Sequence, residues 1–201
     1  MKITNIVILL TCTVNPHLTI KKRIKQNNSL QRLQIYNNII QKWLKKTKFK
    51  IVIVENSGHY FKIKHPRAEI ISFHDNSIKI DKGIYEARSV LHAYKHSSFI
   101  QNNDCHYLVK ITGRYFLPEL QDYFQNLQNT KGVDLILQKK IRSEIVCCKK
   151  HLVSKIFNPK LYFIIEVVIR IRSLTYQKKY FPIFSVSSVR NGKHNKIVKY
   201  I

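Results

Sequence analysis

Tyr107-Leu-Val-Lys-Ile-Thr-Gly-Arg-Tyr-Phe116 is the stretch of this 201-residue chain that decides the fold. Its first half is rich in strand-forming residues and Thr112-Gly113 is a turn signal, so the stretch predicts a buried strand that ends in a tight turn. Open α/β sheets bind ligands at the carboxyl ends of their strands. Lys110 and Arg114 would give such an edge positive charge suited to a phosphate group. The alternative interpretation is an ordinary strand and turn with two solvated cations.

Two earlier apolar runs, residues 6–10 and 51–54, predict strands that are parallel neighbours or near neighbours of this one in a single sheet. Both are continuous runs of β-branched residues and leucine, which is typical of strands covered on both faces. Polar side chains follow each run directly: Thr11 and Thr13 after the first, Glu55 and Asn56 after the second. Hydroxyl, carboxylate and amide groups suit a ribose or a base, although plain backbone turns produce the same pattern.

Helical periodicity separates these strands. After Ser29, a candidate N-cap, apolar residues recur at helical spacing at Leu30, Leu33, Tyr36, Ile40, Trp43 and Leu44. We expect this helix to face the core and to carry no chemistry. A second helix is expected to begin after Asp81, with Lys82 and Gly83 at its amino end, where a helix can bind an anion or only water.

The whole pattern predicts an α/β fold with βαβ winding and one functional edge. Further strands are expected over residues 69–73, 133–138 and 144–148. The expected architecture is a single domain, residues 1–186, with a mostly parallel central sheet flanked by helices. Residues 187–201 form a separate basic tail in this interpretation.

Residues 160–176 predict a long apolar helix with one narrow polar stripe. Tyr162, Glu166, Arg170 and Ser173 follow one another at spacings of four, four and three residues, which places them on one face. Glu166 is the only acid in this helix. It forms either an exposed pair with Arg170 or a carboxylate that faces a cleft.

The formal net charge of +25 comes from 36 Lys and Arg residues against only 11 acids. Cations spread along a chain attract phosphates without regard to sequence, so a basic nucleic-acid-binding protein is the alternative to an enzyme. Against it, the cations do not concentrate in a recognisable module such as a zinc finger. A composition rich in Lys, Ile and Asn and poor in Ala and Gly is also what AT-rich coding DNA gives.

Four cysteines without a Cys-x-x-Cys pair indicate neither a zinc site nor a disulfide framework, which favours a reducing compartment such as the cytoplasm. No run of about 18 apolar residues is present, so we expect no membrane-spanning segment. A weak attraction to anionic surfaces, membranes included, is what the charge implies.

The order of these motifs resembles small glycosyltransferase-like proteins of the GT-A type, found in bacterial surface-polysaccharide loci and in large DNA viruses. The resemblance covers roughly residues 3–170, and its sharpest elements are Lys-x-Thr-Gly-Arg-Tyr at 110–115 and Lys-Gly-x-x-Glu at 82–86. It implies transfer of a sugar from a nucleoside-diphosphate-sugar donor to a glycan or other acceptor.

The resemblance also implies roles for particular residues. The nucleoside would face Thr11, Thr13, Glu55 and Asn56, and the diphosphate would face the cations of the two motifs. The donor-binding residues of those motifs are Lys82, Gly83, Lys110, Thr112, Gly113 and Arg114.

The chain departs from the family pattern at the metal site. Many GT-A enzymes hold Mn²⁺ or Mg²⁺ with an Asp-x-Asp at the exit of the fourth strand, and this sequence contains no Asp-x-Asp. Hard cations need oxygen ligands, which Lys110 cannot supply. We therefore expect no metal cofactor, with fixed cations in its place; the alternative is an inactive relative that only binds nucleotide or polysaccharide. An inverting transfer would need a carboxylate base, for which Glu166 is the first candidate and Glu144 the second.

Overall fold

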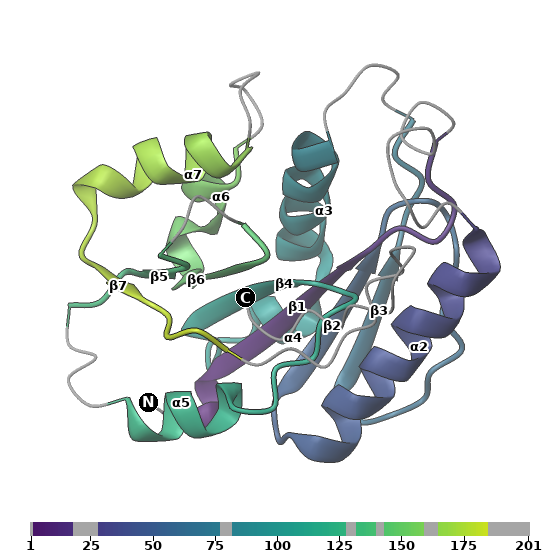
Figure 1. Cartoon of the computed structure of the whole chain (residues 1–201), viewed down its shortest axis with the longest axis horizontal. Coiled ribbons are helices and arrows are strands. Elements are labelled where there is room, and N and C mark those ends of the chain that lie inside the picture. The colour runs from purple at the N-terminus through teal and green to yellow at the C-terminus, as the bar shows by residue number, and fades with distance from the viewer. Residues whose placement is uncertain are drawn as a thin grey trace.

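A computed structural model describes residues 2–17, 28–76, 82–127, 132–139, 143–158 and 165–184. Within these ranges the chain forms a seven-stranded sheet with helices on both faces (Figure 1). The strands are β1 (Ile6–Cys12), β2 (Lys50–Glu55), β3 (Ala68–Ser72), β4 (Tyr107–Thr112), β5 (Leu135–Leu137), β6 (Ile145–Lys149) and β7 (Lys178–Tyr180). The α-helices are α2 (Ser29–Lys46), α3 (Lys82–His96), α4 (Ser98–Gln101), α5 (Leu120–Asn126), α6 (Val153–Ile156) and α7 (Ile165–Arg172). Single 3₁₀ turns are η1 (Ile3–Asn5), η2 (Lys150–Leu152) and η3 (Ser173–Thr175).

The strand order is β3-β2-β1-β4-β6-β5-β7. Strands β3, β2, β1 and β4 are parallel, β6 is antiparallel to both of its neighbours, and β7 is parallel to β5. The predicted α/β fold with one mostly parallel sheet is confirmed. So is the prediction that β1, β2 and β4 are parallel neighbours or near neighbours in one sheet: β1 lies between the other two, with Thr11 opposite both Val54 and Thr112. Their carboxyl ends therefore form one edge.

The pleat of the sheet divides the core into two layers. Ile6, Ile8 and Leu10 of β1 pack in the layer that includes residues of α2 and α5, whereas Val7 and Leu9 pack in the layer that includes residues of α3, α6 and α7. Successive strand residues point to opposite faces. Thr11, the next residue after Leu10, therefore lies on the α3 side of the sheet.

Helix α2 differs from the sequence prediction at its amino end. The N-cap is Asn28, whose side chain accepts hydrogen bonds from the backbone N–H groups of Leu30 and Gln31, and the expected cap Ser29 is the first helical residue. Leu30 is 71% exposed, so its expected place in the core was wrong. The buried residues of α2 begin only at Arg32, because the first turn of the helix precedes its contact with the core.

The carboxyl-terminal part of the chain also differs from prediction. The described part of the expected long helix is α7, which tightens into η3 and leads into β7, an edge strand that the sequence analysis did not predict. Residues 159–164 and the basic tail 187–201 lie outside the described residues, and the division into a domain and a tail stays a prediction. No helix within the described ranges is both long enough and apolar enough to cross a membrane.

Candidate functional site

A pocket of about 120 Å³ lies at the carboxyl edge of β1, β2 and β4, beside the amino-terminal half of α3. Its wall is made by Thr11, Cys12, Thr13, Asn15, Pro16, His17, Arg32, Tyr36, Asn56, Ser57, His74, Asp75, Tyr85, Glu86, Ser89, Thr112 and Arg114. Five of the expected donor-binding residues are in this wall: Thr11, Thr13, Asn56, Thr112 and Arg114. Four others, Glu55, Gly83, Lys110 and Gly113, are outside it. Lys82 begins α3, and its side chain is outside what the structure describes.

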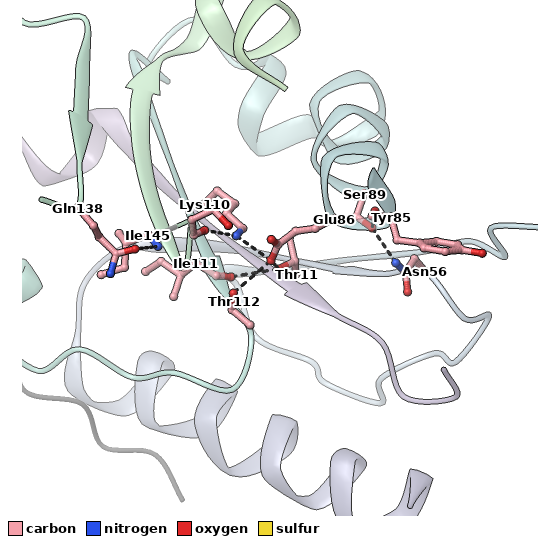
Figure 2. A network of polar contacts seen from close by, with 11 residues as sticks. Thr11, Asn56, Tyr85, Glu86, Ser89, Lys110, Ile111, Thr112, Gln138 and Ile145 are labelled. Carbon is pink, nitrogen blue, oxygen red and sulfur yellow. Dashed lines mark hydrogen bonds and ion pairs between the residues drawn. The ribbon is translucent and has the colours of Figure 1, made fainter. Parts of the chain in front are cut away.

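Glu86 is the centre of the polar network in this pocket, and sequence reasoning missed it. Its Oε1 atom accepts hydrogen bonds from the hydroxyls of Thr11 at 3.0 Å and Thr112 at 3.1 Å, and it pairs with the ammonium of Lys110 at 2.7 Å (Figure 2). In the sequence Glu86 is an ordinary acid near a helix start. The only signal was its place in Lys-Gly-x-x-Glu, since the contacts that define its role come from two different strands.

Lys110 is a buried cation. The residue is 1% exposed, and besides Glu86 its ammonium donates to the carbonyl oxygen of Ser143. The pleat explains this position: Val109 and Ile111 pack in the α2 layer, so Lys110 points to the opposite face, toward α3. Lys110 is outside the pocket wall, whereas its partner Glu86 is in it. The Lys110 charge would therefore affect a ligand by offsetting the negative charge of Glu86.

Glu55 is fully buried and joins the two loops that leave β1 and β2. Its carboxylate accepts from the backbone N–H groups of Val14 at 2.8 Å, Ser57 at 2.9 Å and His59 at 2.8 Å, and from the Ser57 hydroxyl. These contacts match the turn interpretation of this residue. Glu55 therefore does not line the pocket but holds in place the two loops whose residues do.

Asn56 and Thr13 connect the same loops to α3. The hydroxyl of Thr13 donates to Asn56 Oδ1 at 2.7 Å. Figure 2 shows the second contact, in which Asn56 Nδ2 donates to the hydroxyl of Ser89 at 3.0 Å. Both polar ends of the Asn56 amide are thus engaged within the protein. The network fixes the position of this wall relative to the helix.

Arg114 supplies a guanidinium to the pocket from the turn after β4. Its central carbon lies 5.1 Å from the centre of the Tyr115 ring, and the Tyr115 carbonyl is held by the indole N–H of Trp43 at 3.0 Å. Burial alone would lower the pKa of Arg114, but the neighbouring Tyr115, Tyr36 and Glu86 raise it, so the group stays charged. In the part of the chain that the structure describes, no ion pair neutralises Arg114.

Gly113 lets this turn approach β1 closely. A Cβ atom at this position would lie 2.5 Å from Cys12 Sγ and 2.8 Å from the carbonyl oxygen of Thr11. The backbone N–H of Gly113 donates to that same oxygen at 2.9 Å. Gly113 is therefore needed for its small size, and it places Arg114 beside the end of β1.

Helix α2 contributes to the pocket, which corrects the expectation that it carries no chemistry. Arg32 and Tyr36 line the pocket. The Nε of Arg32 donates to the carbonyl oxygen of Thr13 at 2.6 Å, and a terminal nitrogen donates to the Tyr36 hydroxyl at 2.7 Å. The i,i+4 spacing of these residues was visible in the sequence, but their position opposite the β1 exit loop depends on tertiary packing.

Of the two candidate bases, the structure describes the position of Glu144 but not the side chain of Glu166. Glu144 precedes β6, and its carbonyl oxygen accepts from the N–H of Thr112 at 3.0 Å, so it lies at the same edge of the sheet, although it is not in the pocket wall. Glu166 belongs to α7, and its side chain is outside the described residues.

The described residues at this edge do not fit a divalent metal. Among them, no three His, Cys, Asp or Glu side chains gather closely enough to hold an ion. The nearby carboxylate of Glu86 already faces the Lys110 ammonium at 2.7 Å, and a second cation beside it would be repelled. Donor binding without a metal stays a prediction.

Solved structures show the class of fold. The chain has a TM-score of 0.50 and 12% identity to a proposed nucleotide-diphospho-sugar transferase from Desulfovibrio desulfuricans G20, over 89% of this chain and 80% of that one. The chain thus shares the fold of that structure, a GT-A-like fold, as the sequence motifs indicated.

Two further structures align less well. A glycosyltransferase involved in glycosylation of the major capsid of PBCV-1 has a TM-score of 0.48 and 6% identity, over 88% of this chain and 80% of that one. A 4-diphosphocytidyl-2C-methyl-D-erythritol synthase from Anaerococcus prevotii has a TM-score of 0.47 and 8% identity, over 90% of this chain and 89% of that one. No protein-family model and no curated protein sequence matches the chain.

Proposed function

We propose that this protein transfers a sugar from a nucleoside-diphosphate-sugar donor to a glycan or other hydroxyl-bearing acceptor. The observation that carries the proposal is the position of Arg114, a charged guanidinium in the wall of a pocket at the carboxyl edge of β1, β2 and β4. Ligands of open α/β sheets bind at such edges. The nucleotide-sugar-transferase fold agrees with this class of donor.

In the proposed reaction the bond between the sugar and the diphosphate breaks as the acceptor oxygen attacks the sugar. The leaving diphosphate gains negative charge, which Arg114 is placed to stabilise. A fixed donor of this kind is typically worth about 3 kcal/mol in the barrier. Glu86 holds the hydroxyls of Thr11 and Thr112 in place in the same pocket wall as Arg114.

An inverting transfer also needs a carboxylate to take the proton of the acceptor hydroxyl. Glu166 and Glu144 remain the candidates for this base. Glu144 is the one whose position supports the role, because its backbone is bonded to the end of β4.

Calorimetric titration with a panel of nucleoside diphosphates and their hexose derivatives tests the proposal. Arg114→Ala should weaken binding of the preferred diphosphate by ten- to a hundredfold, since a charge-assisted hydrogen bond is worth about 1.5–3 kcal/mol. The control is Lys46→Ala, which removes one positive charge from an exposed position in the last turn of α2. Binding should persist in excess chelator. Binding that disappears in chelator and returns with manganese or magnesium would contradict the metal-free site.

The nucleic-acid alternative predicts a different result. Nonspecific binding is shared among many phosphate contacts, so Arg114→Ala should leave any affinity for DNA nearly unchanged. Tight, sequence-dependent binding of duplex DNA at physiological salt that is lost in Arg114→Ala, with no binding of nucleoside diphosphates, would overturn the proposed function.

A further inference from the structure

Two buried polar atoms lie at the carboxyl edge of the sheet beyond β4, and within the described residues neither has a hydrogen-bond partner. They are Nε2 of Gln138, which follows β5, and Oε2 of Glu144, which precedes β6. Gln138 is only 5% exposed. Folded proteins seldom leave buried polar groups unpaired. A buried group has lost its hydrogen bonds to water, and without a partner in the protein that loss is not compensated.

The backbone brings these two residues close together. The N–H of Ile145, the residue after Glu144, donates to Gln138 Oε1 at 3.1 Å, so the amide group is fixed next to the start of β6 (Figure 2). This bond also determines the orientation of the amide, because the oxygen is the atom that can accept from an N–H. The atom left over is therefore a donor.

The same site adjoins the proposed donor pocket. β6 is the neighbour of β4 in the sheet, and the carbonyl oxygen of Glu144 accepts from the N–H of Thr112, a residue of the pocket wall. Consider a nucleoside-diphosphate sugar whose nucleoside lies over β2 and β1 and whose phosphates lie at Arg114. Its sugar, the group attached to the phosphates, would extend toward β6 and β5.

We propose that Gln138 and Glu144 form a subsite for a sugar hydroxyl. An N–H donor and a carboxylate acceptor together complement a hydroxyl, which accepts one hydrogen bond and donates another. This inference rests on the proposed function and adds a sugar-binding role for two residues outside the pocket wall. The hydroxyl belongs either to the sugar of the donor or to the acceptor.

Three variants test the subsite. Gln138→Glu keeps an oxygen for the Ile145 N–H but removes the donor, and Glu144→Gln weakens the acceptor. The double variant Gln138→Glu with Glu144→Gln exchanges the two groups and leaves the net charge unchanged. The control is Gln121→Glu in α5, where the side-chain oxygen likewise accepts a backbone N–H, from Lys48 at 2.7 Å.

The measurement is the ratio of dissociation constants for the nucleoside diphosphate and its hexose derivative, determined by calorimetry. If the donor sugar occupies the subsite, each single variant should weaken binding of the sugar nucleotide about tenfold and leave the diphosphate within about twofold, as expected for one hydrogen bond. The exchanged double variant should recover most of the loss, because a hydroxyl can reverse its donor and acceptor roles. If the acceptor occupies it, the donor constants stay unchanged and KM for the acceptor sugar rises instead.

Two results would overturn the inference. Single variants that change neither ratio nor KM, or a double variant no better than the worse single one, would show that the two groups bind no sugar. A wild-type protein that binds no nucleoside diphosphate would overturn the proposed function, and this inference with it. The first result leaves the proposed function intact, so the two failures are distinguishable.

Discussion

The buried ion pair between Lys110 and Glu86 should be a strong determinant of stability, and Lys110→Met tests this. Methionine has a similar length and volume, so the substitution removes the charge without opening a large cavity. It leaves the Glu86 carboxylate without its cation in a site where the Lys110 side chain is 1% exposed and the Glu86 side chain 19% exposed.

Breaking one partner of a buried pair typically costs about 3–5 kcal/mol. The lower end, about 3 kcal/mol, is expected here, because the carboxylate is partly exposed and keeps the hydroxyl donors of Thr11 and Thr112. With a urea m value of about 3 kcal/mol/M for a chain of this size, the unfolding midpoint should fall by about 1 M. Trp43, the single tryptophan, is fully buried and reports unfolding by fluorescence.

The matched control is the pair between Lys149 and Asp134, whose atoms are 2.8 Å apart but whose side chains are 29% and 22% exposed. Lys149→Met should cost less than about 1 kcal/mol, because the Lys149 side chain keeps far more contact with water than that of Lys110. Adding Glu86→Gln to Lys110→Met should restore more than about 1 kcal/mol, since the uncompensated charge is then gone. Equal losses in the two lysine variants, or no recovery in the double variant, would refute the reasoning.

Three further outcomes are expected. Gly113→Ala should lower the free energy of unfolding by about 1–3 kcal/mol, because the added methyl group would overlap Cys12 Sγ and the Thr11 carbonyl; urea unfolding measures it, and an unchanged midpoint would contradict the close approach. The hydrogen bond from Lys149 holds the pKa of Asp134 below its usual 3.8, so the stability lost in Asp134→Asn should be full at neutral pH and shrink as the pH falls below that value; a loss independent of pH would contradict this. Burial raises the pKa of all four cysteine thiols, that of Cys105 to about 11, so a thiol reagent should label the folded protein slowly and label four sites after unfolding; rapid labelling of the native protein would contradict their burial.

The sequence by itself determined the strand pattern and the edge of the sheet at which the pocket lies. Continuous apolar runs can be buried only between two layers, and a polar or glycine-bearing exit after each run marks the end where the chain leaves the sheet. That was enough to predict β1, β2 and β4 as parallel neighbours and to place Thr11, Thr112 and Arg114 at one edge.

Only the tertiary structure decided which charges face the pocket. Lys110 and Arg114 are four residues apart and look equivalent in the sequence, yet the pleat sends Lys110 beneath α3 to Glu86 while the turn at Gly113 presents Arg114 to the pocket. Likewise the Glu55 carboxylate binds the backbone of two loops inside the protein, and Glu86 and Arg32 line the pocket. The physical reason is that a polar side chain takes whichever partner burial brings within hydrogen-bond distance, and that partner lies on another element, far away in the sequence.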